Sequence, residues 1–187
     1  MMESTQSLSA LSAPSAALSP EKKVLAWYDA WADDMLRFCF LCLGSQQEAE
    51  KALCEAFLRL MKNSSASQEY PFSSPRTLCL RSACIVCKKS LRRFRRFYPA
   101  DDAALSAQLA AFGCTQPDDL NLLSGIMHLP FTERCILLMT CWLGLTEEET
   151  AYVMHLRLAA LRKHRVLAEE LLTKSGRKEK EYDEHTT

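Results

Sequence analysis

The sequence predicts an all-α protein made of two small helical domains joined by a linker. Helix-forming Ala, Leu, Glu, Arg and Lys dominate, β-branched residues are sparse, and only five glycines occur. Apolar residues recur at intervals of three and four, as on one helix face. A segment rich in Ala and Asp, punctuated by Pro99, Gly113 and Pro117, interrupts this pattern. For these 187 residues we expect a disordered segment over 1–19, a helical domain over 20–98, a linker over 99–117, a second helical domain over 118–172 and a polar tail over 173–187.

The first domain begins with a predicted helical hairpin. The segment SPE at 19–21 supplies an N-cap, a proline at the first helical position and an acid in the first turn, and Gly44 ends this helix. Ser45 begins a second helix, with Glu48 three residues later as in a capping box, and Asn63 ends it. Apolar residues follow helical spacing in both, so we expect each helix to bury one face.

A third helix, which begins at the Ser74-Pro75 pair, combines a buried stripe with a strongly basic face. The stripe consists of Leu80, Cys84, Cys87, Leu91 and Phe94. From Pro71 to Pro99 there is no acid, yet eight residues are basic: Arg76, Arg81, Lys88, Lys89, Arg92, Arg93, Arg95 and Arg96. A polyanion relieves the repulsion among such cations, and aromatic residues between them suit stacking on unpaired bases. This predicts nucleic-acid binding, with a solvated basic face or an acidic protein partner as the alternatives.

The second domain carries a predicted helix-turn-helix. Two helices are expected over 120–128 and 131–143, and then Thr146 and Glu149 form a second capping box at the start of a short helix. After a brief turn, a long helix from about Leu156 to Leu172 carries five basic residues: Arg157, Arg162, Lys163, His164 and Arg165. In a helix-turn-helix the first helix crosses the DNA backbone and the second enters the major groove. The pattern therefore predicts a second DNA-binding helix.

These motifs resemble the sigma-70 family of RNA polymerase sigma factors, in the extracytoplasmic-function type that keeps only regions 2 and 4. Residues 129–172, with Leu-Pro, Glu-Arg, an aliphatic run, Gly-Leu-Thr, Glu-Glu and a basic helix, resemble region 4. The hairpin sequence GSQQEAEKALCEAFLRLMKN resembles region 2.2, and the arginine-rich helix resembles regions 2.3 and 2.4. The resemblance implies a sigma factor that binds core RNA polymerase and directs it to promoter DNA for transcription initiation.

The resemblance also assigns roles to residues. The −10 element would be bound by the region 2-like helix, through Arg81, Lys88, Lys89, Arg92, Arg93, Arg95 and Arg96. The −35 element would be bound by the region 4-like helix, through Arg157, Arg162, Lys163 and His164. Core polymerase, through its β′ clamp coiled coil and β flap, is the implied partner, with Lys51, Cys54, Glu55 and Phe57 on the docking surface.

Several positions depart from the family pattern, among them Lys51, Cys54 and His155. Lys51 and Cys54 replace the usual aspartate and glutamine of region 2.2, and His155 replaces the glycine of the region 4 turn. Two alternatives stay open, the first of them because of Lys51 and Cys54. One is a helix-turn-helix DNA-binding regulator that no longer engages polymerase. The other is a helical adaptor whose basic helix binds an acidic protein such as an anti-sigma factor.

The nine cysteines include two CxxC pairs, Cys39 with Cys42 and Cys84 with Cys87. Four thiolates at this spacing can bind zinc, but both pairs lie inside helices, where a thiol behaves as a small hydrophobe. We therefore expect core thiols, no metal, no cofactor and no enzymatic activity. An odd cysteine count in apolar surroundings favours a reducing cytoplasm. No signal peptide is recognisable and no apolar run approaches the roughly 18 residues that span a bilayer, so we expect a cytoplasmic protein without membrane contact.

Overall fold

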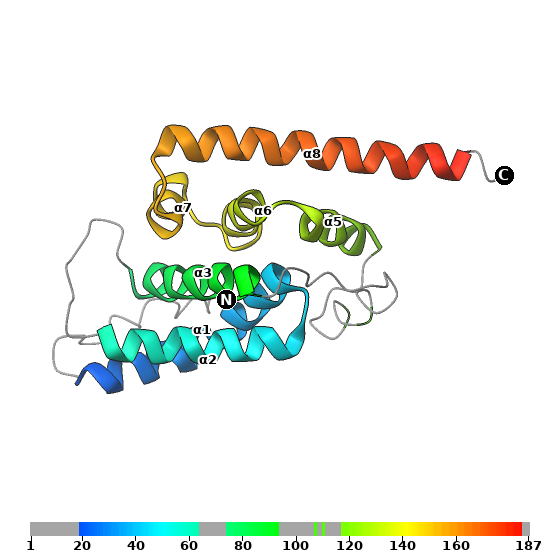
Figure 1. Ribbon diagram of the computed structural model, residues 1–187. Coiled ribbons are helices and arrows are strands. Elements are labelled where there is room, and N and C mark those ends of the chain that lie inside the picture. Colours follow the sequence, from blue (N-terminus) through cyan, green and yellow to red (C-terminus); the bar gives the residue numbers. More distant parts are fainter. Residues whose placement is uncertain (1–18, 64–73, 94–106, 108–109, 111–116, 185–187) are drawn as a thin grey trace, which may run out of the picture.

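The computed structural model describes residues 19–63, 74–93, 107, 110 and 117–184. Every regular element in this part of the chain is helical, which confirms the all-α expectation (Figure 1). The elements are α1 (Pro20–Leu43), α2 (Gln46–Asn63), α3 (Pro75–Arg93), α5 (Pro117–His128), α6 (Phe131–Leu137), the π-helical turn η1 (Leu138–Trp142), α7 (Glu147–Met154) and α8 (Leu158–Glu184).

Helices α1, α2 and α3 pack against one another and form the N-terminal half. The Ser19 side chain accepts a hydrogen bond from the Lys22 N–H, and Gly44 ends α1 in the left-handed conformation at φ 71°. Both caps follow the sequence prediction, because a serine satisfies a free N–H and glycine adopts positive φ without strain. The buried face of α2 consists of Ala49, Ala52, Leu53, Ala56 and Phe57. Through this face α2 packs against α1 and α3 and completes the core of the three-helix group.

Helices α5 to α8 form the C-terminal half, in which α8 covers α6 and α7 (Figure 1). Helix α6 passes directly into η1, where the Leu143 N–H donates to the Leu138 carbonyl at 2.9 Å. The Thr146 side chain accepts from the Glu149 N–H at 3.1 Å, and the Glu149 carboxylate accepts from the Thr146 N–H at 2.9 Å. The predicted capping box is therefore present, and it sets the start of α7.

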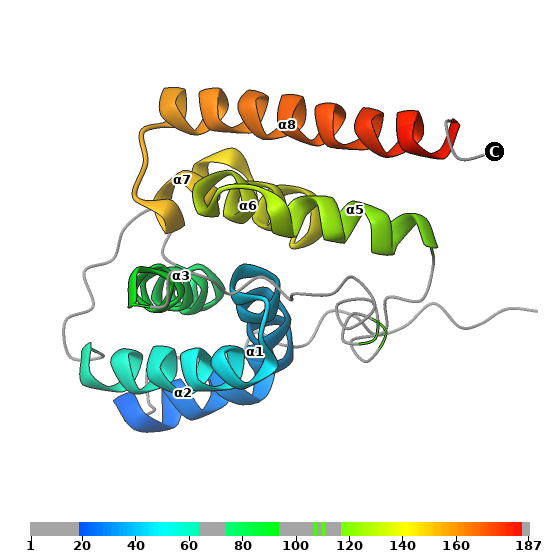
Figure 2. The ribbon, with the colours of Figure 1, turned by 45° about the vertical axis from the view of Figure 1, so that its right-hand side comes forward.

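The two halves pack closely together. Figures 1 and 2 show α3 between the α1–α2 hairpin and the C-terminal half, and α3 packs against α7 while α1 contacts α5 and α6. One cluster of buried hydrophobic residues runs without interruption from α1 through α3 into the C-terminal half. Each half thus covers apolar surface of the other. Burial of this surface favours the arrangement in which the two halves are packed together, here called the closed arrangement.

Some predicted boundaries differ from those observed. Helix α8 continues to Glu184, whereas the sequence pattern predicted an end at Leu172. The expected segment 1–19 and linker 99–117 lie outside the described residues, apart from Ser19, Ala107, Ala110 and Pro117. Among the described helices, none has both the length and the apolar character needed to cross a membrane.

Candidate nucleic-acid interface and polymerase-facing surface

Helices α7 and α8 form a helix-turn-helix around His155. This residue adopts φ 56° and ψ 46°, the left-handed conformation, and it is the one non-glycine residue with positive φ in the described part of the chain. The Leu156 N–H then donates to the Ala151 carbonyl at 2.9 Å, which closes the turn. The Arg157 carbonyl accepts from the Leu161 N–H at 3.0 Å as α8 begins. A histidine thus fills the position where glycine avoids strain.

Apolar side chains fix the angle between these helices. Ile136 of α6, Ala151 of α7 and Leu161 of α8 form a small buried cluster, with Met154, Leu156 and Leu158 packed against it. The small Ala151 side chain allows the two helices to approach closely. The first turns of α8 are consequently held on a rigid support of α6 and α7, with their outer face toward solvent.

Three exposed cations lie at the start of α8: Arg157, which directly precedes the helix, and Arg162 and Lys163 in its second turn. The Arg162 Nε lies 2.8 Å from the Glu147 Oε2, and hydrogen bonding to Arg162 lowers the pKa of the Glu147 carboxyl. Among the described residues, no ion pair involves Arg157 or Lys163. Two of the three cations are thus available to an anionic ligand without first breaking an ion pair.

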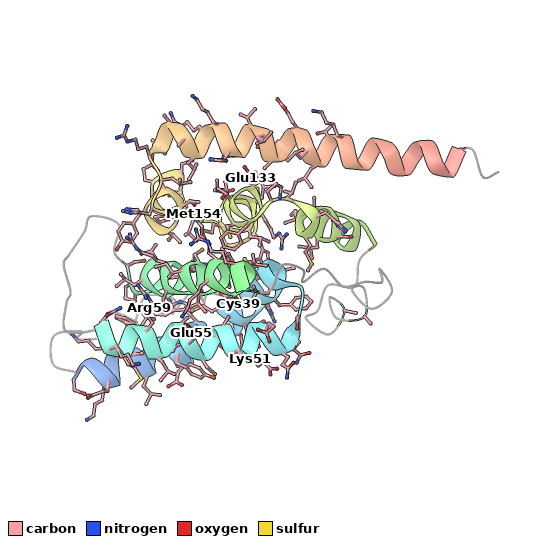
Figure 3. The ribbon with its side chains drawn as sticks, viewed as in Figure 1. Cys39, Lys51, Glu55, Arg59, Glu133 and Met154 are labelled. Carbon is pink, nitrogen blue, oxygen red and sulfur yellow. The ribbon has the colours of Figure 1, made fainter. Side chains whose placement is uncertain are left out.

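His164 and Arg165 have mainly internal partners. The His164 Nδ1 lies 2.7 Å from an oxygen of Glu133, a residue that is only 5% exposed and lies between α6 and α8 (Figure 3). Arg165 pairs with Glu169 at 3.1 Å and with Glu147 at 3.4 Å. His164 was predicted to face the −35 element. In the structure it contacts Glu133 of α6, one of the helices on which α8 packs.

The basic residues of α3 separate into two groups. Arg81 faces the C-terminal half, where its Nη1 donates to the Tyr152 carbonyl at 3.0 Å and its guanidinium lies 4.8 Å from the Tyr152 ring centre. Lys88 and Arg92 are exposed one helical turn apart. Lys89 forms an ion pair with Glu55 of α2 at 2.7 Å. Lys88 and Arg92 at the end of α3 are therefore directed toward solvent, and their contact with DNA stays a prediction.

Three predicted DNA-binding residues are not described at the level of their side chains. Arg95 and Arg96 lie outside the described residues, as do the aromatic residues Phe94, Phe97 and Tyr98. Arg93 ends α3, and only its place in the helix is described. Their predicted contacts with DNA stay predictions.

The outer face of α2 carries three of the four predicted polymerase contacts. Lys51, Cys54 and Glu55 are exposed, and Figure 3 shows Lys51, Glu55 and Arg59 along this helix. A shallow depression of about 440 Å³ is lined by Gln47, Glu50, Lys51, Cys54, Glu55 and Leu58. Leu58 is 55% exposed and adds an apolar side chain to this surface, which the sequence analysis did not single out.

Phe57 lies elsewhere than predicted. Its side chain is only 6% exposed and meets the Tyr28 ring edge-on, with ring centres 5.0 Å apart. The assignment of Phe57 to the docking surface is therefore corrected. In this structure Phe57 supports the α1–α2 hairpin from within, because its apolar ring is buried more favourably in the core than in water.

Arg134 is the most consequential residue that the sequence analysis missed. It is only 3% exposed, and its guanidinium donates to the Leu129 carbonyl at 2.8 Å and, across the two halves, to the Cys42 carbonyl at 2.6 Å. Arg76 similarly donates to the Leu143 carbonyl at 2.9 Å. An arginine directly before the apolar run 135–139 was the available signal, because a buried charge needs hydrogen-bond partners.

The four cysteines of the CxxC pairs are buried, which confirms the expectation of core thiols. Cys39, Cys42 and Cys87 are 0% exposed, and Cys84 is 5% exposed. They meet where α1 passes α3, and Cys135 of α6 joins them from the C-terminal half.

Neither the family models nor the curated proteins compared with this chain give a match.

Proposed function

We propose that this chain is a sigma-like transcription initiation factor that binds promoter DNA and core RNA polymerase. The observation that carries the proposal is the helix-turn-helix of α7 and α8, in which exposed Arg157 directly precedes α8 and exposed Lys163 lies in its second turn. Cations at the start of the second helix are where this motif meets base edges and phosphates. A sigma-like protein would use them at the −35 element.

Two further surfaces suit this function. The exposed end of α3, with Lys88 and Arg92, offers cations to the phosphates of the −10 element. The depression on α2, with Leu58 beside Lys51, Cys54 and Glu55, has the mixed apolar and charged lining of a docking surface. The polymerase would supply the chemistry of RNA synthesis, and this chain would contribute promoter choice.

The closed arrangement must open for the proposed function. The −10 and −35 elements are separated by about 25 base pairs, which is roughly 85 Å along the DNA axis at about 3.4 Å per base pair. In the closed arrangement Arg81 of α3 lies 3.0 Å from the Tyr152 carbonyl of α7, so the two DNA-binding elements are adjacent. Binding both elements at once requires the halves to separate, and we expect polymerase to stabilise the open form.

The decisive experiment combines full-length chain, core RNA polymerase and a pool of random promoter DNA. We expect a complex with core polymerase and recovery of DNA with two spaced conserved elements. The absence of both a complex and any selected sequence would overturn the proposal. Leu58→Asp should weaken the polymerase complex at least tenfold, because it places a charge in the depression. Leu25→Asp is the matched control, since Leu25 is 62% exposed and lies outside the depression.

A second candidate is a DNA-binding regulator that does not engage polymerase. The observation that favours it is the ion pair between Lys89 and Glu55, because Glu55 then already has a partner within the chain. Lys51 likewise pairs with Glu48 at 2.7 Å. Selective DNA binding together with no retention of the chain by core polymerase at low salt would favour this candidate over the sigma-like function.

A further inference from the structure

Five buried thiols meet where the two halves of the molecule touch, and we call Cys39, Cys42, Cys84, Cys87 and Cys135 the thiol cluster. The Sγ atoms of Cys42 and Cys135 are 3.6 Å apart, although the two residues are 93 positions apart in the sequence. Both are 0% exposed. Cys87 also lies close to Cys39 and Cys42, and Cys84 lies close to Cys135. Figure 3 shows Cys39 in the interior between α3 and the α1–α2 hairpin.

Cys135 is the member of the thiol cluster that lies on the C-terminal half, so its contacts with Cys42 and Cys84 connect the halves, and the contact with Cys42 is the one at 3.6 Å. Cys39 and Cys87 both belong to the N-terminal half, whereas Cys42 lies near the end of α1 and Cys135 lies on α6. A covalent bond between the last two would therefore join the halves. In the described part of the chain, no group of three or more Cys, His, Asp or Glu side chains is arranged so that it could hold a metal ion. Reaction between two thiols is the chemistry that the observed contacts favour.

The surroundings distinguish the two sulfurs. Burial alone would raise the pKa of the Cys42 thiol, but hydrogen bonds with Cys135 and Cys87 and the charge of Arg134 together hold that pKa well below its ordinary value. Burial raises the pKa of the Cys135 thiol well above its ordinary value. Because the thiolate is the nucleophilic form, Cys42 suits the attacking position and Cys135 the resolving position.

We propose that Cys42 and Cys135 are a redox modification site, and that oxidation by a hydroperoxide joins them in a disulfide that fixes the two halves together. The proposal rests on geometry: a contact of 3.6 Å between sulfurs on α1 and α6, next to the Arg134 guanidinium that spans the same boundary. The bond would convert a separable contact between the halves into a covalent one.

The chemistry balances with hydrogen peroxide as the oxidant. The Cys42 thiolate attacks one peroxide oxygen, so that an S–O bond forms, the O–O bond breaks, and the departing hydroxide takes up the proton released from Cys42 as water. The Cys135 sulfur then attacks the sulfenic sulfur, an S–S bond forms, the S–O bond breaks, and the hydroxide leaves with the Cys135 proton as a second water. Overall, two thiols lose two electrons and one peroxide is reduced to two waters.

The burial of both thiols makes the site sensitive to the state of the molecule. In the closed arrangement the sulfurs are shielded, so peroxide reaches Cys42 when the halves part, and closure then brings Cys135 to the sulfenic acid. The functional consequence rests on the proposed function: an oxidised chain keeps α3 against α7 and cannot span two promoter elements. Reduction of the disulfide would release it.

Peptide mapping of the full-length chain tests the site directly. Reduced protein is treated with a small excess of hydrogen peroxide, alkylated, digested without reductant and analysed by mass spectrometry. We expect the peptide containing Cys42 to be linked to that containing Cys135 as the most abundant cross-linked pair. A predominant Cys39–Cys87 or Cys84–Cys135 link, or sulfinic acids without any link, would overturn the proposal.

Two matched variants separate the bond from general damage. Cys135→Ser should abolish the link between the halves, whereas Cys84→Ser removes a neighbouring buried thiol and should preserve it. Both variants carry a similar cost of placing a hydroxyl in the core, so circular dichroism of the pair shows whether folding is affected. Loss of the link in Cys84→Ser but not in Cys135→Ser would contradict the assignment.

DNA binding tests the consequence, with a duplex carrying the two selected elements. Oxidation should lower the affinity of the wild-type chain at least tenfold, dithiothreitol should restore it, and Cys135→Ser should be insensitive to peroxide. A mapped Cys42–Cys135 bond that leaves affinity unchanged would overturn the locking role. Reduced protein that binds no DNA would overturn the proposed function, while the peptide map still decides whether the disulfide forms.

Discussion

The two helices proposed to bind DNA use their arginines in different ways. On α3, Arg76 and Arg81 donate to backbone carbonyls of the C-terminal half. On α8, Arg162 and Arg165 pair with carboxylates of their own half. Both helices carry several basic residues, but position relative to the boundary between the halves decides what each cation does. The cations of α3 near that boundary hold the closed arrangement, and those beyond it remain exposed.

The largest effect is expected at Arg134, which joins the halves from inside the core. Arg134→Met keeps much of the side-chain volume but removes the hydrogen bonds to Leu129 and Cys42, and leaves buried carbonyls without those donors. The free energy of unfolding should fall by about 3 kcal/mol, measured by urea denaturation. Arg37→Met is the control, because Arg37 is exposed and should change stability by less than about 0.5 kcal/mol. Equal losses in both variants would contradict a joining role for Arg134.

The next effect distinguishes the two helices that are proposed to bind DNA. Lys163→Ala on α8 should lower DNA affinity about tenfold and change the preferred sequence, because a groove contact reads bases. Arg92→Ala on α3 should weaken binding to all sequences similarly and reduce its dependence on salt. Binding-site selection and salt titration give the measurements. Lys174→Ala, an exposed lysine further along α8, should change neither property.

The contact between α3 and α7 should be weaker than the buried one at Arg134. Arg81→Met removes the hydrogen bond to the Tyr152 carbonyl and the contact with the Tyr152 ring. We expect opening of the halves to become easier by about 1 kcal/mol, or roughly fivefold, seen as faster amide hydrogen exchange in α7. Lys89→Met, which removes only an exposed ion pair within the N-terminal half, should leave that exchange unchanged. Unchanged exchange in Arg81→Met would show that apolar packing alone holds α7 on α3.

Features that depend on neighbouring residues were predictable from the sequence. The N-cap at Ser19, the helix end at Gly44 and the capping box of Thr146 and Glu149 all involve residues within four positions of one another. The buried stripe of α3 was predictable for the same reason, and Leu80, Cys84 and Cys87 are buried as expected. Local hydrogen bonding and helical periodicity fix these features before any tertiary contact forms.

The contacts between the halves were not predictable in this way. The hydrogen bond from Arg134 to Cys42 joins residues 92 positions apart, and that from Arg81 to Tyr152 joins residues 71 apart. No local pattern marks a backbone carbonyl as the partner of a distant arginine. The basic residues of α3 and α8 could therefore be singled out from the sequence. Which of these cations are exposed and which have partners inside the molecule required the structure.

The smallest effect concerns the turn between α7 and α8. His155 occupies the left-handed region at φ 56°, where a side chain is strained and glycine is not. His155→Gly should relieve that strain, offset in part by the greater freedom of glycine in the unfolded chain, and raise the free energy of unfolding by about 0.5 kcal/mol. Thermal denaturation checks this. Arg157→Gly, two residues further at a position without positive φ, should lower stability instead, and a similar gain in both variants would show that the turn is not strained at His155.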